Sequence, residues 1–217
     1  MNSRRPAPVA GPCMLARHQT QRAASAVKLD NSSGRFANMN EPDLKLLVKA
    51  LTFAAHKHKD QRRKDVAASP YINHPITLVN VLCNEGNVMD IATICGALLH
   101  DTVEDTETTA EELEAAFGKT IRDIVIDVTD DKTLPKAARK QAQIDHAPHI
   151  SDQAKLVKLA DKISNLRDIR QNPPAEWSPQ RRQEYFEWAR RVVDRLRGTH
   201  AGLEALFDEI YEQRSVE

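Results

Sequence analysis

The sequence has little cysteine and no long apolar run. Its 217 residues include three cysteines, Cys13, Cys83 and Cys95, with no CxxC pair, which excludes a disulfide scaffold and a cysteine-ligated zinc knuckle. Free thiols are typical of a reducing compartment. No apolar run reaches the roughly 18 residues that a transmembrane helix needs, so we expect no membrane partner.

The sequence also lacks an excess of charge of either sign. The 31 Lys and Arg residues balance 31 Asp and Glu residues, and the formal net charge is zero. A general nucleic-acid-binding protein is basic overall, so we expect no nucleic-acid partner. The length suits one large domain or two small ones, and it is sufficient for a real hydrophobic core.

The balance of charge conceals a basic N-terminal segment. Residues 1–40 contain six Lys or Arg residues but a single acid, Asp30, together with prolines and glycines and no sustained apolar period. This composition predicts a disordered basic leader over 1–40 and a folded domain over 41–217. It also fits an organellar transit peptide; the alternatives are a leader without function or a start codon assigned too early, since Met39 precedes the first good helix. No apolar segment suited to secretion is present, so we expect a cytoplasmic location, with organellar targeting left open.

Glycine and strand-like alternation are both scarce after residue 40. Five of the seven glycines lie there, and no stretch alternates apolar and polar residues for long enough to require a sheet. Leu44, Leu47, Val48, Leu51 and Ala55 follow the helical i, i+3, i+4 spacing of one buried stripe. The sequence therefore predicts a compact all-α domain of about eight helices.

Several polar residues are placed to begin these helices. Asp90 precedes an apolar run over 91–99 and is placed to cap a helix that we expect to run from Ile91 to about Thr102. Ser151 and Ser178 precede two further helical patterns. Thr108, with an acid three residues later, forms the pattern of a capping box, and Thr199 is the expected cap of the last helix.

The residues that indicate chemistry begin at the end of the apolar run over 91–99. His100 and Asp101 follow it directly, and a second acidic pair, Glu104 and Asp105, comes soon after. Burying a carboxylate costs several kcal/mol, which a metal ion or another cation can offset.

Two more polar residues complete a candidate metal site. His74 lies in a PYINHP string, and Asp161 lies four residues before Asn165, so the last two share one helix face. Two imidazoles and two carboxylates suit one divalent ion with mixed nitrogen and oxygen ligands, such as manganese. The alternative for each residue alone is a packed core histidine, or for Asp161 a structural ion pair.

The wider strings around these residues resemble a known family. They are similar to the stand-alone metazoan SpoT homologues, HD-domain metal phosphohydrolases related to the hydrolase half of RelA/SpoT enzymes, and the similarity runs from about residue 41 to about residue 213. The strings are QRRK at 61–64, PYINHP at 70–75, LLHDTVED at 98–105, VTDDKTLPK at 128–136, KLVKLADK at 155–162 and YFEW at 185–188.

The resemblance implies an HD-domain helical fold and a hydrolase. Its substrate would be the alarmone guanosine 3′,5′-bisdiphosphate (ppGpp), cut at the 3′ pyrophosphate to give GDP and pyrophosphate, as in the stringent response. The chain ends too early to hold the synthetase domain of the bifunctional relatives, so we expect it to degrade the alarmone and not to make it.

The resemblance also assigns roles to individual residues. It implies that His74, His100, Asp101 and Asp161 hold one Mn²⁺ ion, while Glu104 and Asp105 orient the attacking water and handle protons. The implied substrate-binding residues are Arg63, which would stack on the purine, Lys64, which would reach a phosphate, Asn165 near the ribose, and Lys136, Arg181 and Tyr185 at the phosphates. Ser164 departs from the family pattern, in which this position usually carries a larger, often aromatic side chain.

Three other functions remain open from the sequence. The first is an HD-domain phosphatase acting on NADPH or another nucleotide with a ribose 2′ or 3′ phosphate. The second is a nucleotide sensor without catalysis, although a sensor would be expected to lack a metal ligand or a catalytic acid. All four candidate metal ligands and both acids of the Glu104–Asp105 pair are present. The third is a dinuclear site that recruits His146 and His149, although Pro148 between them favours a turn. A homo-oligomer is also left open.

Overall fold

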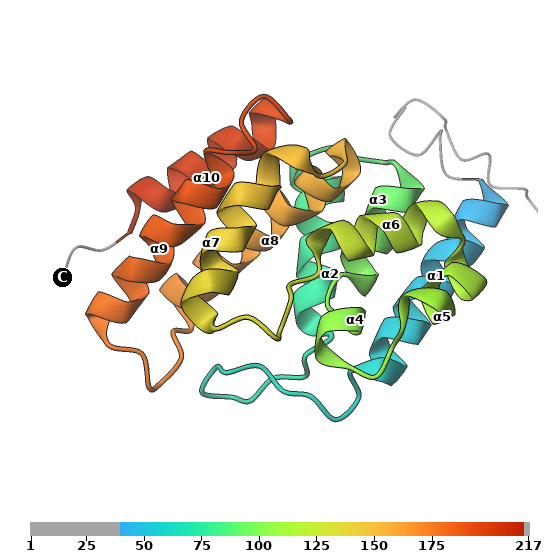
Figure 1. Cartoon of the computed structure of the whole chain (residues 1–217), viewed down its shortest axis with the longest axis horizontal. Helices are drawn as coiled ribbons and strands as arrows, with labels where there is room; N and C mark the ends of the chain where they lie inside the picture. The colour runs from blue at the N-terminus through green and yellow to red at the C-terminus, as the bar shows by residue number, and fades with distance from the viewer. Residues whose placement is uncertain (1–39, 215–217) are drawn as a thin grey trace, which may run out of the picture. The chain divides into compact units, whose positions relative to one another are not determined.

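The computed structural model describes residues 40–214; the predicted leader falls almost wholly outside them, and its boundary stays a prediction. Figure 1 shows the helices in chain order. They are α1 (Glu41–Lys57), α2 (Asn73–Asn80), α3 (Ile91–Leu99), α4 (Thr102–Asp105), α5 (Ala110–Phe117), α6 (Lys119–Val128), α7 (Lys136–His146), α8 (Asp152–Gln171), α9 (Pro179–Val193) and α10 (Ala201–Glu212).

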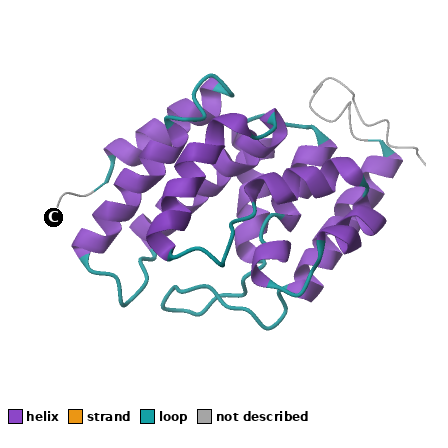
Figure 2. Cartoon of the chain, in the orientation of Figure 1, coloured by secondary structure: helices purple, strands orange, loops and turns teal. Residues whose placement is uncertain are grey.

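The prediction of an all-α domain is confirmed. Helices and loops account for residues 40–214 in Figure 2, and the one β-type contact among them is an isolated bridge between Arg62 and Pro70. Ten α-helices are present in this part of the chain instead of about eight. One reason is that the helix expected to run through residue 102 ends at Leu99, and the short α4 follows it.

Helices α3 and α8 occupy the centre of this domain. Helix α3 contacts α1, α2, α6 and α8, and α8 contacts α2, α6, α9 and α10 (Figure 1). Gly96 allows the close approach of α3 to α6, because a Cβ at this position would lie 2.5 Å from Cγ2 of Ile124. Two central helices fixed on several sides give a rigid frame for the side chains they carry.

The core consists of two apolar clusters. One surrounds α8 and the C-terminal helices and includes Leu159, Ile163 and Phe207, all fully buried. The other joins α1, α3, α5 and α6 and includes Leu99 and Leu113. Since α3 contributes to both clusters, the residues that follow its last turn lie between two well-packed regions.

Three of the five predicted helix caps are confirmed. The side chains of Asp90, Ser151 and Ser178 each accept a hydrogen bond from the backbone N–H three residues later. Each cap satisfies one of the N–H groups that a helix start leaves without an intrahelical partner. These caps therefore fix the starts of α3, α8 and α9.

The other two predicted caps are wrong by one residue. Thr109, not Thr108, caps α5, because the hydroxyl of Thr108 instead shares a 2.7 Å hydrogen bond with the hydroxyl of Thr106. His200, not Thr199, caps α10, since its Nδ1 accepts a 3.1 Å hydrogen bond from the backbone N–H three residues later. Adjacent polar residues compete for the same cap, and the local hydrogen bonds decide between them.

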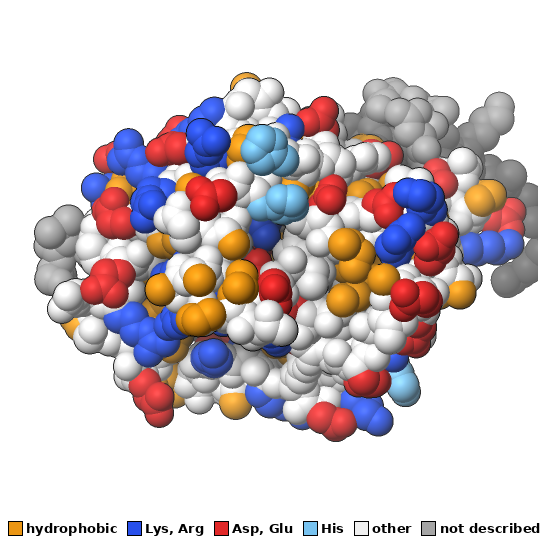
Figure 3. Space-filling model, viewed as in Figure 1, with side chains coloured by type: hydrophobic (Ala, Val, Ile, Leu, Met, Phe, Trp, Pro, Cys, Tyr) orange, Lys and Arg blue, Asp and Glu red, His pale blue; other side chains and the backbone are white. Residues whose placement is uncertain are grey.

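The surface mixes charges of both signs. On the face in Figure 3, Lys and Arg side chains alternate with Asp and Glu side chains, and small apolar patches lie between them. Among the helices of residues 40–214, none combines the length and apolarity that crossing a membrane requires.

Candidate active site

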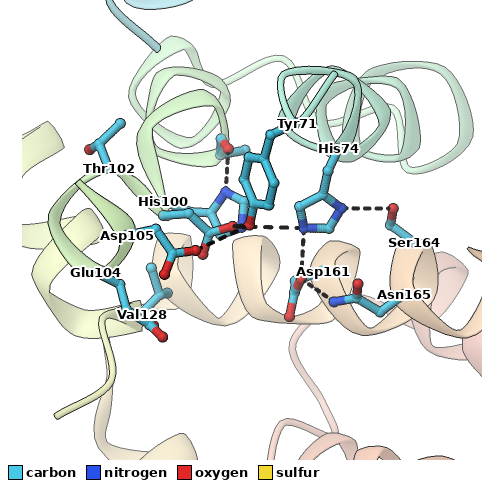
Figure 4. Close-up of polar contacts among 12 residues, drawn as sticks. Tyr71, His74, His100, Thr102, Glu104, Asp105, Val128, Asp161, Ser164 and Asn165 are labelled. Carbon is cyan, nitrogen blue, oxygen red and sulfur yellow. Dashed lines mark hydrogen bonds and ion pairs between the residues drawn. The ribbon is translucent and has the colours of Figure 1, made fainter. Parts of the chain in front are cut away.

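The candidate site lies where three central helices meet. His74 belongs to the first turn of α2, His100 and Asp101 follow the last residue of α3, and Asp161 lies in the middle of α8. Contacts of α2 and α3 with each other and with α8 bring these side chains together from distant parts of the sequence. Figure 4 shows His74, His100 and Asp161 converging beside Tyr71.

His74, His100 and Asp101 form the tightest group. One ligand atom from each lies within 4.8 Å of the other two, and both histidines are buried. The Nε2 atom of His100 is 2.8 Å from Oδ2 of Asp101, and Nε2 of His74 is 3.9 Å from the same oxygen. The arrangement brings three of the four predicted ligands to one point.

Asp161 lies beside this group but outside the 4.8 Å set. Its Oδ1 is 3.3 Å from Nε2 of His74 and accepts a 2.6 Å hydrogen bond from Asn165. Its Oδ2 is 3.0 Å from Nζ of Lys162. The face shared by Asp161 and Asn165 is confirmed, and the role of Asp161 as a fourth ligand stays a prediction.

Hydrogen bonds orient both imidazole rings. The Nδ1 atom of His100 is 2.9 Å from the carbonyl oxygen of Ala97, so Nδ1 carries a proton and donates to this carbonyl, which leaves Nε2 as the ring nitrogen that faces Asp101. The Nδ1 atom of His74 is 3.4 Å from Oγ of Ser164, and its Nε2 faces Asp161 (Figure 4). Such outer contacts are the usual way in which proteins orient a metal-binding histidine.

The donor set fits a divalent metal ion. The Nε2 atom of His100 is buried and faces Oδ2 of Asp101 at 2.8 Å, and the raised pKa of His100 places a proton between these two atoms when no metal is bound. A divalent cation can take the place of that proton, because metal binding displaces protons from its ligands. Imidazole nitrogen with carboxylate oxygen is a ligand set that several divalent transition metals accept.

Opposite charges hold the two aspartates ionised. Burial alone would raise the pKa of Asp101, but His100 outweighs it and lowers that pKa. Lys162 and His74 lower the pKa of Asp161 against burial in the same way. Burial by itself would lower the pKa of both histidines. At His100 the Asp101 carboxylate outweighs burial and raises the pKa to about 9. At His74 burial is the larger effect, and the pKa is lowered.

Glu104 differs from the aspartates in its electrostatics. Its Oε2 accepts a 3.2 Å hydrogen bond from the backbone N–H of Asp130. Burial, followed by repulsion from the Asp130 and Asp101 carboxylates, raises the pKa of Glu104 to about 7. A carboxyl group with a pKa near 7 can both accept and release a proton at physiological pH.

Asp105 is tied to the metal-binding group through Tyr71. The Tyr71 hydroxyl donates a hydrogen bond to Oδ2 of Asp101 and lies 3.5 Å from Oδ2 of Asp105. Lys132 pairs with the other oxygen of Asp105, and Gln61 donates a 2.6 Å hydrogen bond to its backbone carbonyl. Burial, with these carboxylates, raises the pKa of Tyr71, so its hydroxyl stays a donor.

A cleft of two adjoining chambers opens beside these groups. The chamber that is lined by the metal-binding group, His74, His100 and Asp101, and by Asp161 is called the inner chamber and has a volume of about 340 Å³; the other, of about 360 Å³, is called the outer chamber. Both are lined by a shared set of residues: Arg63, Lys64, Tyr71, His74, Asp105, Asn165 and Tyr185. Four of the predicted substrate-binding residues, namely Arg63, Lys64, Asn165 and Tyr185, therefore border one continuous space.

Arg63 is held in place within this cleft. Its guanidinium pairs with Asp168 and lies 5.8 Å from the centre of the Tyr71 ring. The backbone N–H of Arg63 donates a 2.8 Å hydrogen bond to the carbonyl of Ser69, which fixes the loop before α2. A flat cation held in this way can stack on a planar ring that enters the outer chamber.

Lys136 and Arg181 lie outside the lining of both chambers. They are exposed on the first turns of α7 and α9. Arg181 lies 4.4 Å from the ring centre of Trp177, a residue that lines the outer chamber. Both cations act electrostatically on Lys140, which lies over the Tyr185 ring at 5.5 Å. Their contact with substrate stays a prediction.

Sequence reasoning missed two lysines of the inner chamber. Lys158 donates a 3.0 Å hydrogen bond to the carbonyl of Val128, and Lys162 lies 4.4 Å from the ring centre of Trp188. Both line the inner chamber and are almost fully buried. The string at 155–162 contains them, but only its aspartate received a role, because lysine on a helix is usually a solvated residue.

The dinuclear alternative has no support in the described residues. His146 ends α7 and lines a small cavity that shares Asp130, Gln143 and Lys158 with the inner chamber, and His149 belongs to the turn after α7. Within residues 40–214, the side chains close enough together to bind a metal ion are those of His74, His100 and Asp101, and neither His146 nor His149 belongs to this group.

The fold and the site together define a class of protein: helical domains with a buried group of histidine and aspartate side chains. A family model described as an HD domain matches residues 50–188. The chain therefore belongs to the HD-domain family, and the resemblance drawn from the motifs is confirmed.

Individual relatives cover about four fifths of the chain. The chain is 54% identical over 178 residues to a zebrafish (Danio rerio) protein named "Guanosine-3′,5′-bis(diphosphate) 3′-pyrophosphohydrolase MESH1", across 82% of this chain and 99% of the relative. The human protein of the same name is 53% identical, across 78% and 95%. A solved structure titled "A metazoan ortholog of SpoT hydrolyzes ppGpp and plays a role in starvation responses" has a TM-score of 0.76 at 47% identity, across 79% of this chain and 97% of that one.

Proposed function

We propose that this chain is a metal-dependent guanosine-3′,5′-bis(diphosphate) 3′-pyrophosphohydrolase, which converts ppGpp and water to GDP and pyrophosphate. The observation that carries the proposal is the buried group of His74, His100 and Asp101 at the inner end of a cleft lined by Arg63 and Lys64. The proteins named for this activity share about half of their residues with it over nearly their whole length.

The metal site is assigned to four residues. His74, His100 and Asp101 would hold one divalent ion, with Asp161 as the fourth ligand once its carboxylate turns from Asn165. We propose Mn²⁺, which accepts mixed imidazole and carboxylate ligands. Such an ion lowers the pKa of a coordinated water toward neutrality and so supplies a nucleophile at working pH.

In this proposal Glu104 carries the proton transfers, and Asp105 positions the attacking water. Because its pKa is about 7, Glu104 is partly ionised at neutral pH and can take a proton from water before delivering one to the leaving 3′ oxygen. Asp105, fixed by Tyr71 and Lys132, would hold the attacking water in line with the phosphorus.

The basic residues of the cleft receive the nucleotide. Arg63 would stack on the guanine, and Asn165 would hydrogen-bond the ribose beside the metal. Burial raises the pKa of Tyr185 to about 12, so its hydroxyl stays a hydrogen-bond donor to a phosphate oxygen. Lys64, Lys136 and Arg181, with the buried Lys158 and Lys162, would offset the charge of the two diphosphates.

Paired turnover measurements test this function. Purified enzyme with Mn²⁺ is given ppGpp or NADPH at equal concentrations, and products are identified by ion-exchange chromatography. We expect GDP and pyrophosphate from ppGpp with a larger kcat/KM than for NADPH. A larger kcat/KM for NADPH would favour the alternative phosphatase, and no turnover of either would favour a sensor.

Location and assembly stay predictions with direct tests. A fluorescent fusion of the whole chain, compared with one that lacks residues 1–40, tests the expected cytoplasmic location against organellar targeting. Light scattering on the purified full chain tests for a homo-oligomer.

A further inference from the structure

A second cavity lies at the junction of α8, α9 and α10. Its volume is about 260 Å³, and three of its lining residues are arginines from three different helices or their ends: Arg170, Arg182 and Arg214. No acidic residue lines it. Three cations around one small space, without a carboxylate among them, is an unusual arrangement, because like charges repel at short range.

The charge of Arg182 is not compensated within the described residues. Its Nε is buried without a hydrogen-bond partner, and no ion pair of its guanidinium is found in residues 40–214. A guanidinium that no carboxylate neutralises attracts an anion to the space beside it. Arg182 therefore indicates a missing anionic acceptor.

The other two arginines have only partial compensation. Arg214 has partners outside the cavity lining: its Nε lies 3.7 Å from Glu187, and its Nη1 lies 4.0 Å from Glu212 and donates a 3.0 Å hydrogen bond to the carbonyl of Tyr211. Arg170 donates its 2.6 Å hydrogen bond to the neutral amide of Gln213. Neither arginine brings a carboxylate into the lining of the cavity, so Arg182 stays without an ion pair in residues 40–214.

The surroundings favour an anion as well. The buried side chains of Ile169 and Phe186 line the cavity and lower the local dielectric, which strengthens charge–charge attraction. The cavity also includes residues of the first turn of the 15-residue helix α9, where the helix dipole is positive.

We propose that this cavity is a second binding site, for a small phosphate-bearing anion such as inorganic pyrophosphate. Arginine presents planar pairs of N–H donors that match phosphate oxygens. The volume lies below the roughly 300 Å³ at which pockets for drug-sized ligands begin, so a small anion fits better than a whole nucleotide.

The site is separate from the catalytic cleft. Of its lining residues, Ile169 also lines the outer chamber of the cleft, and none lines the inner chamber. An anion bound here would tie the first turn of α9 to the ends of α8 and α10. The inference does not depend on the proposed hydrolase activity.

Calorimetric titration with inorganic pyrophosphate tests the proposal. The full chain is freed of metal and carries Lys64→Gln in every sample, which weakens binding in the catalytic cleft. Three proteins are compared: this background alone, the background with Arg182→Gln, and the background with Arg195→Gln. Arg195 is a matched control because it is an exposed arginine just after α9 and lines no cavity described above.

We expect Arg182→Gln to weaken pyrophosphate binding by about tenfold or more, and Arg195→Gln to change it less than twofold. Arg170→Gln, measured alongside, should weaken binding as well and guards against a folding defect of the Arg182 variant, which its melting temperature would show. Unchanged binding in the Arg182 and Arg170 variants would overturn the proposal. An equal loss in the Arg195 variant would also overturn it, because the effect would then be one of net charge.

Discussion

Replacement of Glu104 by glutamine separates proton transfer from metal binding. The substitution keeps the size of the side chain, and the amide oxygen can still accept the 3.2 Å hydrogen bond from the Asp130 backbone. It removes the negative charge and the group that titrates near pH 7. We therefore expect an intact fold and near-normal metal content with impaired chemistry.

The magnitude follows from the role assigned to this carboxyl group. General acid–base catalysis contributes about 10²- to 10⁴-fold, so kcat should fall by at least about 100-fold, equivalent to about 2.7 kcal/mol of transition-state stabilisation. KM should change little, because Glu104 does not line the outer chamber.

The pH profile gives the sharper readout. A base must be ionised to accept a proton, so kcat of the wild type should rise with pH and level off above about pH 7, following the pKa of Glu104. The Glu104→Gln variant should lack this rise. Initial rates from pH 5.5 to 9 at saturating ppGpp measure both, with Mn²⁺ content checked by atomic emission. Full turnover in the variant, or an unchanged profile, would refute the assignment.

Other substitutions test the rest of the account. Arg63→Ala should raise KM for ppGpp by a few-fold to about thirtyfold with a smaller change in kcat, since stacking contributes about 0.5–2 kcal/mol; steady-state kinetics would contradict this if only kcat fell. His100→Ala should lose most of the bound Mn²⁺, and full metal content would disprove the ligand assignment. Gly96→Ala should destabilise the fold by about 1–3 kcal/mol in urea, because its Cβ would lie 2.5 Å from the α6 side chain; unchanged stability would show that α6 can shift. Ser178→Ala should cost about 1 kcal/mol through loss of the α9 cap, and an unchanged urea midpoint would argue against it.

Local patterns in the sequence predict much of the active site. The apolar run over 91–99 predicts a buried α3, so the His100–Asp101 pair directly after it had to lie inside the domain. The four-residue spacing of Asp161 and Asn165 predicts their shared face, and their 2.6 Å hydrogen bond confirms it. These features depend on residues close in sequence, which is why they can be found there.

Other features depend on tertiary contacts and could not be predicted. The hydrogen bond from Tyr71 to Asp101 joins residues thirty positions apart, and the arginines of the second cavity come from the ends of three helices. Ser164 illustrates the same limit: its smaller size is evident in the sequence, but its 3.4 Å contact with His74 follows only from the packing of α2 on α8.

The most direct test of the central claim is a phosphorus NMR time course of ppGpp hydrolysis by the metal-free full chain, before and after addition of Mn²⁺. The account predicts no turnover before addition and, after it, loss of the 3′ diphosphate signals with equal growth of GDP and pyrophosphate. Turnover that persists without a metal would contradict the role of His74, His100 and Asp101. Release of orthophosphate in place of pyrophosphate would contradict the proposed reaction.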